Sequence, residues 1–412
     1  MSAIRWQGCG ARRVRAWLAP AAIAGLLVGA SLSTRAAASD TACKGPDLWP
    51  TNPDRLAREI ATACNALVIR GSADPNQLSE AYNMLSICLG ILGLNKGRLD
   101  LSSKAIEKRP GDAVLYDNRG RVYFGDDALE PALADAKTAM RLNSSLVRPL
   151  LLAGRVKARS GDEDAALSYF RQAITVNKDH PESYMELGRF NIARGRPRQA
   201  LDDFVRSEYL IQKDAFGTEA HNWTLDFRAK AMEGRCRALA MLAEASAGAV
   251  CDRALGERPA SANANLGKGL IDLANRDDET ALKHFNGAVR SDPYLSEAIV
   301  ARGKVYESRG DLERARQEYD RAIERQPKQA WGYLARGELF EKEGQGAKAE
   351  QALAKAIEVQ PRLPQAHSVM AAYYERKNET IEAVEQYKRA LELDPGNQEA
   401  KSGLARLRNR TD

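Results

Sequence analysis

The sequence predicts an all-α solenoid, a row of about nine helix-turn-helix repeats of 34 residues with a capping helix at each end. Three observations favour this fold. The composition is rich in Ala, Leu, Arg and Glu, while aromatic residues make up only 6%, which is typical of helical proteins. Residues 310–327, GDLERARQEYDRAIERQP, are matched by residues 378–395, NETIEAVEQYKRALELDP. Prolines also close most repeats at one fixed point, where a helix must end.

This period divides most of the chain into nine repeats. Small residues recur at positions 8, 20 and 27 of most repeats, with Arg98 and Arg235 as exceptions, because two antiparallel helices can approach closely only where the side chains are small. Larger side chains at positions 4, 11 and 24 fill the remaining space, and Gly-Asp pairs break the chain between the helices. In repeat 5, one extra residue in the turn would restore Gly234 to position 8 and bring Arg235 to position 9. Repeats 1–9 are residues 79–112, 113–146, 147–180, 181–214, 228–261, 262–295, 296–329, 330–363 and 364–397.

These positions resemble the tetratricopeptide repeat (TPR) family, and the likeness covers residues 79–397. Residues 113–214 depart from proline at position 32, but they keep most of the Gly and Ala framework. The resemblance implies an α-solenoid in which the first helix of each repeat, helix A, lines a concave groove. It also implies binding, because most members of the family bind peptides or other proteins.

The segment from Met1 to Ala38 is predicted to be a signal peptide. A basic stretch ends at Arg15, uncharged residues follow from 16 to 34, and small residues precede Ser39. An uncleaved membrane anchor is the alternative, although the run is short and interrupted by Pro20. We expect a cleaved protein that begins at or near Ser39 and is periplasmic or secreted. Membrane attachment is expected only if the segment is retained.

Further segments flank or interrupt the repeats. One helix is expected before the first repeat and another after the last, because a solenoid must cover its terminal apolar faces. A break in the period contains Trp223 and Phe227, which are expected to dock on the solenoid. The predicted order is signal peptide 1–38, N-terminal cap segment 39–78, repeats 1–4 at 79–214, insertion 215–227, repeats 5–9 at 228–397 and C-terminal capping helix 398–412.

The charge of the chain argues against nucleic acid as a partner. The net charge of +6 arises mostly in the predicted signal peptide, which contains five arginines and no acidic residue. Without that segment the chain has 56 basic and 55 acidic residues. A mature protein of this composition has no overall positive field to attract DNA or RNA.

Five cysteines follow the predicted signal peptide, and in an exported protein two pairs are expected, which leave Cys88 as a buried free thiol. Cys236 lies in helix A of repeat 5 and Cys251 in helix B, so the two side chains can meet across the hairpin. Cys43 and Cys64 are close enough in sequence to bridge the N-terminal cap, and Cys64 with Cys88 is the alternative. No CxxC motif is present, so neither a redox motif nor a zinc site is indicated.

No catalytic motif is present. The chain has no GxSxG sequence, no phosphate-binding loop and no dinucleotide fingerprint, and its four histidines are far apart. No cofactor, metal site or enzymatic activity is therefore expected. The leading interpretation is a non-catalytic scaffold that binds a protein or peptide. A structural spacer, a polysaccharide-handling component of an envelope export assembly and an enzyme with an unrecognised site are the alternatives.

Two ladders of charge follow the predicted groove. If positions 2, 5, 9, 12 and 13 of helix A face the concavity, as the resemblance implies, basic residues line its first half and acidic residues its second. Arginine can bind a carboxylate through two hydrogen bonds, so the first half is expected to bind an acidic segment, with an anionic polysaccharide as the alternative. A solvated helix face with no binding role would give the same charges. The candidate groove residues are Arg121, Arg155, Arg159, Arg189, Glu307, Glu341 and Glu375.

Overall fold

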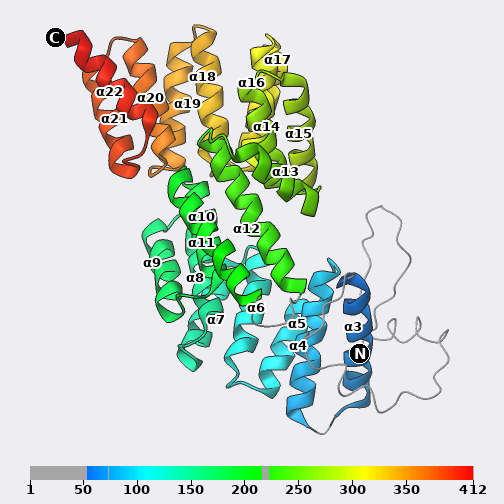
Figure 1. The fold of residues 1–412 in the computed structure, drawn as a ribbon. Coiled ribbons are helices and arrows are strands. Elements are labelled where there is room, and N and C mark those ends of the chain that lie inside the picture. Colours follow the sequence, from blue (N-terminus) through cyan, green and yellow to red (C-terminus); the bar gives the residue numbers. More distant parts are fainter. Residues whose placement is uncertain (1–52, 73, 216–221, 412) are drawn as a thin grey trace. The chain divides into compact units, whose positions relative to one another are not determined.

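The computed structural model describes residues 53–72, 74–215 and 222–411, and these form α-helices with no β-strand (Figure 1). The predicted signal peptide and Cys43 lie outside the described residues. The helices are α3 (Pro53–Arg70), α4 (Pro75–Ile91), α5 (Arg98–Lys108), α6 (Ala113–Gly125), α7 (Leu129–Leu142), α8 (Val147–Ser160), α9 (Glu163–Val176), α10 (Pro181–Ala193), α11 (Pro197–Ala215), α12 (Asn222–Met241), α13 (Ala247–Glu257), α14 (Ala262–Ala274), α15 (Asp278–Ser291), α16 (Ser296–Ser308), α17 (Leu312–Arg325), α18 (Ala330–Lys342), α19 (Gly346–Val359), α20 (Pro364–Arg376), α21 (Thr380–Leu393) and α22 (Gln398–Thr411).

Helices α4 to α21 form nine consecutive hairpins, and each hairpin is one of the repeats found in the sequence. Helix α3 packs against α4 through Ile60 and Leu85, and α22 packs against α21 through Leu407 and Tyr387. The all-α solenoid predicted from the period is therefore confirmed.

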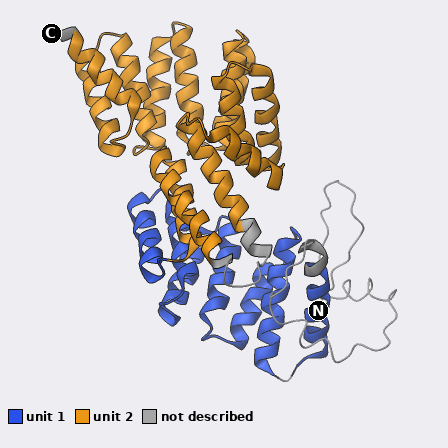
Figure 2. Ribbon diagram, viewed as in Figure 1, with its two compact units in different colours: residues 1–178, 220–223 blue, residues 179–219, 224–412 orange. Residues whose placement is uncertain are grey.

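The described residues form two compact bodies (Figure 2). The N-terminal body ends at Lys178 and also includes residues 222 and 223; the C-terminal body begins at Asp179. Repeat 4 thus belongs with repeats 5–9, whereas the sequence suggested a break after it, in residues 215–227. From Asn222 onward the expected insertion is helical, because it forms the start of α12. Phe227 packs against a cluster that includes Phe204, which joins α12 to repeat 4.

The turn between the two helices contains a residue with a positive φ angle in every repeat. This residue lies at position 15, and its φ angle reverses the chain and is one that glycine adopts most readily. Four repeats place another residue there, and alanine is the least suited of these because it has no polar side chain to stabilise the conformation locally. The nine turn residues are Gly93, Asp127, Gly161, Gly195, Ala243, Arg276, Gly310, Gly344 and Asn378.

Close helix contact explains the small residues. The alanines at positions 20 and 27 are at most 2% exposed. At position 8, a Cβ atom on Gly154 would lie 2.6 Å from the ring of Phe170, and one on Gly303 would lie 2.5 Å from the ring of Tyr319. The ring at position 24 therefore occupies the space that a side chain at position 8 would need.

Repeat 5 differs from the expected register. Gly234 faces Phe204, at position 24 of the preceding repeat, and a Cβ atom added to Gly234 would lie 2.3 Å from the ring. Gly267, at position 6 of repeat 6, faces Cys251, at position 24 of repeat 5, in the same way. Gly234 therefore corresponds to position 6 and not to position 8. Ala243 has the positive φ angle of position 15, which places Cys236 at position 8. The turn of repeat 5 is thus one residue shorter than the others, and the expectation that it is one residue longer was wrong.

Candidate functional site

Helix α8 of the N-terminal body, which the repeat pattern places along the predicted groove, is basic. Helix α8 contains Arg148, Arg155, Lys157 and Arg159 and no acidic residue. By contrast, α16, α18 and α20 each contain equal numbers of acidic and basic residues. Helix α8 is therefore a local concentration of positive charge in a chain that is otherwise nearly balanced.

One basic residue of α8, Arg148, shares a carboxylate with Arg121 of α6. Asp117 of α6 is 2% exposed, and its Oδ2 lies 3.2 Å from Nε of Arg121 and 3.3 Å from Nη2 of Arg148. Arg121 reaches it from one helical turn along α6, and Arg148 reaches it from the start of α8. A buried carboxylate needs such partners because its charge has been removed from water.

The other two predicted arginines of this body lie over one aromatic ring. The Cζ atoms of Arg155 and Arg159 are 4.6 and 4.2 Å from the ring centroid of Phe124, which is 8% exposed. Arg159 also donates to the carbonyl oxygen of Phe124 and to Oδ1 of Asp127, both at 3.2 Å. Both guanidinium groups are within the distance at which a cation is attracted to a ring face.

Arg189 belongs to the C-terminal body, where its Nη1 donates to Oε1 of Glu186 at 3.0 Å. In repeat 5 the residue at position 9 is Arg237, not Arg235, because of the shorter turn. Arg237 is 9% exposed and donates to Asn263 at 3.0 Å and to Glu297 at 2.7 Å. Only the altered register reveals Arg237, so the sequence pattern missed it.

The acidic ladder is bonded to cations. Nζ of Lys342 donates to Glu307, and Arg376 donates to both oxygens of Glu341 at 2.5 and 2.6 Å. Arg406 likewise donates to both oxygens of Glu375 at 3.0 and 2.8 Å. Each cation comes from the following repeat or from the capping helix, so these glutamates connect successive repeats.

Tyrosines reinforce two of these connections. Tyr319 donates to Glu307 at 2.6 Å and Tyr387 donates to Glu375 at 2.8 Å. Burial, followed by the hydrogen bond to the carboxylate, raises the pKa of both phenols. The bond to Glu375 likewise raises the pKa of the Arg406 guanidinium. The glutamates predicted to line this part of the groove therefore have partners within the protein, and a role for them in ligand binding stays a prediction.

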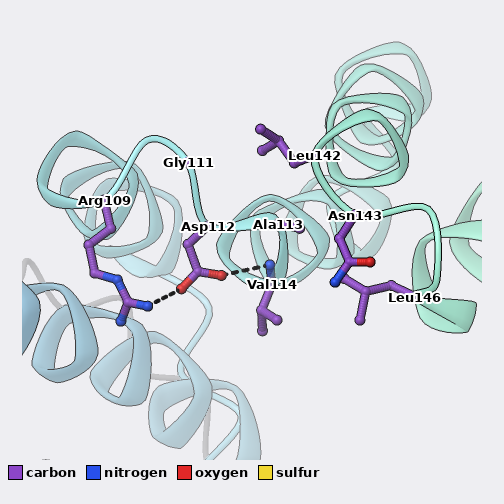
Figure 3. A pocket seen from close by; sticks show the side chains of 8 residues that line it. All are labelled: Arg109, Gly111, Asp112, Ala113, Val114, Leu142, Asn143 and Leu146. Atoms are coloured by element: carbon purple, nitrogen blue, oxygen red, sulfur yellow. Dashed lines mark hydrogen bonds and ion pairs between the residues drawn. The ribbon is translucent and has the colours of Figure 1, made fainter.

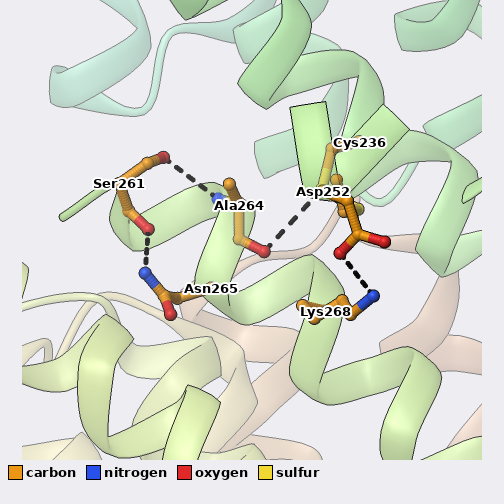
Figure 4. The surroundings of a disulfide bond; sticks show 7 residues. Cys236, Asp252, Ser261, Ala264, Asn265 and Lys268 are labelled. Atoms are coloured by element: carbon orange, nitrogen blue, oxygen red, sulfur yellow. Dashed lines mark hydrogen bonds and ion pairs between the residues drawn. A yellow bond between two sulfur atoms is a disulfide. The ribbon is translucent and has the colours of Figure 1, made fainter. Parts of the chain in front are cut away.

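Cys236 and Cys251 form a disulfide, as the sequence predicts (Figure 4). It joins positions 8 and 24 of repeat 5, and in repeat 1 the same positions are joined by a hydrogen bond between Ser86 and Ser102 at 2.8 Å. Helix α14 passes close to it, since a Cβ atom on Gly267 would lie 2.6 Å from Sγ of Cys236.

For the cysteines near the N-terminus, the structure describes the bonding state of Cys64 and of Cys88. Cys64 is disulfide-bonded, and its predicted partner Cys43 lies outside the described residues. Cys88 is free and buried, and burial raises the pKa of its thiol to about 11. The alternative bridge between Cys64 and Cys88 is therefore wrong.

A shallow pocket of about 530 Å³ lies where the turns before α6 and α8 approach one another (Figure 3). Arg109 and Asp112 on its edge form an ion pair of 2.7 Å, and Asp112 also accepts from the amide of Val114 at 2.9 Å. These polar groups stabilise the start of α6, so they do not define a catalytic site. Within the described ranges, no group of His, Cys, Asp or Glu is arranged to hold a metal ion.

A partly buried carboxylate in repeat 4, that of Asp203, is expected to make the stability depend on pH. Burial raises the pKa of Asp203 from 3.8 to about 7, although Asn191 donates to it at 2.8 Å. In the equivalent place of repeat 2, Asp135 is bonded to Arg119 at 2.8 Å. Well below pH 3.8, Asp203 is protonated in the folded and unfolded states alike, and between pH 3.8 and about 7 the unfolded state ionises first, which lowers the stability of the fold. As the pH rises through 7, the buried group must ionise, and the stability contributed by its protonated form is lost.

We expect Asp203→Asn to raise the free energy of unfolding by about 1–3 kcal/mol at pH 8 and to change it little at pH 4. Urea unfolding measured between pH 4 and 8 tests this. Asp202→Asn, which replaces an exposed neighbour, serves as the control. Parallel stability curves for wild type and Asp203→Asn would contradict the assignment.

Comparison with known proteins agrees with the geometry. Models described as tetratricopeptide repeat match residues 151–217, 237–296 and 364–397, and a TPR repeat model matches residues 303–344. Human DnaJ homolog subfamily C member 7 is 27% identical over 205 residues, which cover 48% of this chain and 40% of that protein. Tetratricopeptide repeat protein 33 of Xenopus laevis is 26% identical over 147 residues, 36% of this chain and 55% of that protein. The chain thus spans only about half of these relatives.

The nine hairpins, their common turn and their Gly–aromatic crossings define an α-solenoid repeat protein. With the family matches, the chain is a tetratricopeptide repeat protein. Among the described helices, none is long and apolar enough to cross a membrane.

Proposed function

We propose that this protein is a non-catalytic scaffold that binds an extended acidic protein segment on the concave face of its N-terminal body. The observation that carries the proposal is α8, with four basic residues and no acidic one. In water, charges of one sign on a surface attract a partner of the opposite sign and speed its association. The family supports a protein or peptide as the partner.

We also propose that the protein works outside the cytoplasm, in the periplasm or as a secreted protein of the cell envelope. The disulfide between Cys236 and Cys251 supports this, because disulfides persist mainly in oxidising compartments. Mass measurement of the protein recovered from the producing cells tests it. A product that begins near Ser39 is expected, and a cytoplasmic full-length product would overturn this part.

The binding proposal predicts that a fluorescein-labelled peptide of ten glutamates binds the protein and that a peptide of ten glutamines does not. Arg155→Ala should weaken binding of the glutamate peptide by about 1–3 kcal/mol, the usual value of a hydrogen bond to a charged group. Fluorescence anisotropy at two salt concentrations measures this, and higher salt should weaken binding through screening.

Arg171→Ala is a matched control, since it removes an exposed arginine from α9, a B helix of the same body. It should change the affinity little. Equal affinities of wild type and Arg155→Ala, without salt dependence, would show that the arginines are only a solvated face. Binding of polygalacturonate in preference to the glutamate peptide would replace the proposal with a polysaccharide partner.

A further inference from the structure

Arg155 and Arg159 are unusual among the basic residues of the groove because they converge on a single ring. They are four residues apart on α8, on adjacent turns of one face, where like charges destabilise a helix. The Cζ atoms of both lie within 4.6 Å of the centroid of Phe124. The fold thus holds two positive groups near one point, at a cost in stability.

Two features fix their orientation. Phe124 belongs to the core of the N-terminal body, packed with Leu152 and Val156 of α8, so its ring has little freedom to move. Arg159 is further directed by its bonds to the carbonyl oxygen of Phe124 and to Asp127. Asp127 occupies the positive-φ position of the turn, which sets where its carboxylate lies.

The carboxylate partner of Arg159 is weakly held, which distinguishes this arginine from Arg121. The side chain of Asp127 is 75% exposed, whereas that of Asp117, which bonds Arg121, is 3% exposed. An ion pair in water contributes little, so a ligand anion can replace Asp127 at small cost. The buried Asp117, in contrast, cannot release its arginines without leaving an uncompensated charge.

We propose that Arg155 and Arg159 form an anchoring subsite for one oxyanion of the bound segment, a carboxylate or a phosphate, and that Phe124 is its positioning residue. This rests on the proposed function and names the group that the groove recognises. A guanidinium group presents a planar set of donors, and two of them held on one ring can surround a single group of two or three oxygens. The ring itself does not touch the ligand; it keeps both donors in place.

Phe124→Leu tests the proposal, because it removes the ring and keeps every charge. The probes are the fluorescein-labelled peptide of ten glutamates and a peptide of ten residues that alternates glycine and phosphoserine. We expect Phe124→Leu to weaken binding of at least one peptide about tenfold, with an unchanged salt dependence, and Phe124→Tyr to restore the affinity to within about twofold. The peptide that loses more affinity identifies the group held as carboxylate or phosphate.

Two further variants separate positioning from general destabilisation. Leu133→Ala weakens the same core cluster from α7 and should leave the affinity unchanged at a temperature where the protein is folded. Arg155→Lys with Arg159→Lys keeps both charges without the planar donors, and it should weaken binding as Phe124→Leu does. This comparison remains available if Phe124→Leu fails to fold.

The outcomes distinguish the two proposals. If Arg155→Ala weakens binding while Phe124→Leu and the double lysine variant bind as wild type does, the subsite is overturned and the acidic-segment function stands. If the wild-type protein binds neither peptide, both the acidic-segment function and the oxyanion subsite are overturned. A loss of affinity in Leu133→Ala equal to that in Phe124→Leu would also overturn the positioning role.

Discussion

Gly303→Leu should reduce the free energy of unfolding by about 3 kcal/mol or more, because overpacking a closed helix crossing forces the backbone to shift. The first added atom would lie 2.5 Å from Cε1 and 2.9 Å from Cδ1 of Tyr319 and 3.2 Å from Cβ of Glu318. The ring cannot swing away readily, since Tyr319 is fully buried and its hydroxyl is bonded to Glu307. Urea unfolding followed by circular dichroism measures the loss.

Gly303→Ala should be much milder. Repeat 9 has alanine at the same position, Ala371, facing Tyr387, and both residues are fully buried. A single carbon can thus be accommodated by a small separation of the helices. Gly256→Ala on α13 is the control, since its added Cβ meets nothing within 4 Å, and it should be neutral or slightly stabilising. Unchanged stability of Gly303→Leu would show that this crossing is looser than the structure indicates.

Loss of the disulfide is the second large effect expected. Cys236 and Cys251 close a loop with a sequence separation of 15, and breaking such a loop costs roughly 3 kcal/mol. Cys236→Ala, Cys251→Ala and the double variant should lose similar amounts, because any one of them breaks the bond, whereas independent side chains would add. Replacing both cysteines with serine should regain about 1 kcal/mol over the double alanine, since Ser86 and Ser102 bond to each other at these positions in repeat 1.

Peptide mapping without reduction checks the bond directly. The expected product is a linked pair of peptides that contain Cys236 and Cys251. Recovery of both residues alkylated before reduction would contradict the predicted disulfide. Cys88 should be alkylated only after unfolding, because it is free and buried and its thiol pKa is raised to about 11.

The sequence by itself determined the repeat, because the forces that require it act within one hairpin. Two helices joined by a short turn must place small residues where they cross. Accordingly, positions 20 and 27 are both alanine in every repeat but two. The same local logic predicted the turns of the other eight repeats, the capping helices and the cysteine pair of repeat 5. It also located the basic residues of α8.

The tertiary structure determined the side-chain contacts between neighbouring repeats. It placed Cys236 rather than Gly234 at position 8, because the register of α12 depends on its packing against Phe204 of the preceding repeat. It connected Glu341 to Arg376, which lie 35 residues apart, and so showed that the acidic ladder has partners within the solenoid. It also brought Arg155 and Arg159 over Phe124. Such contacts depend on how far side chains reach across neighbouring helices, and the period of the repeat does not encode that distance.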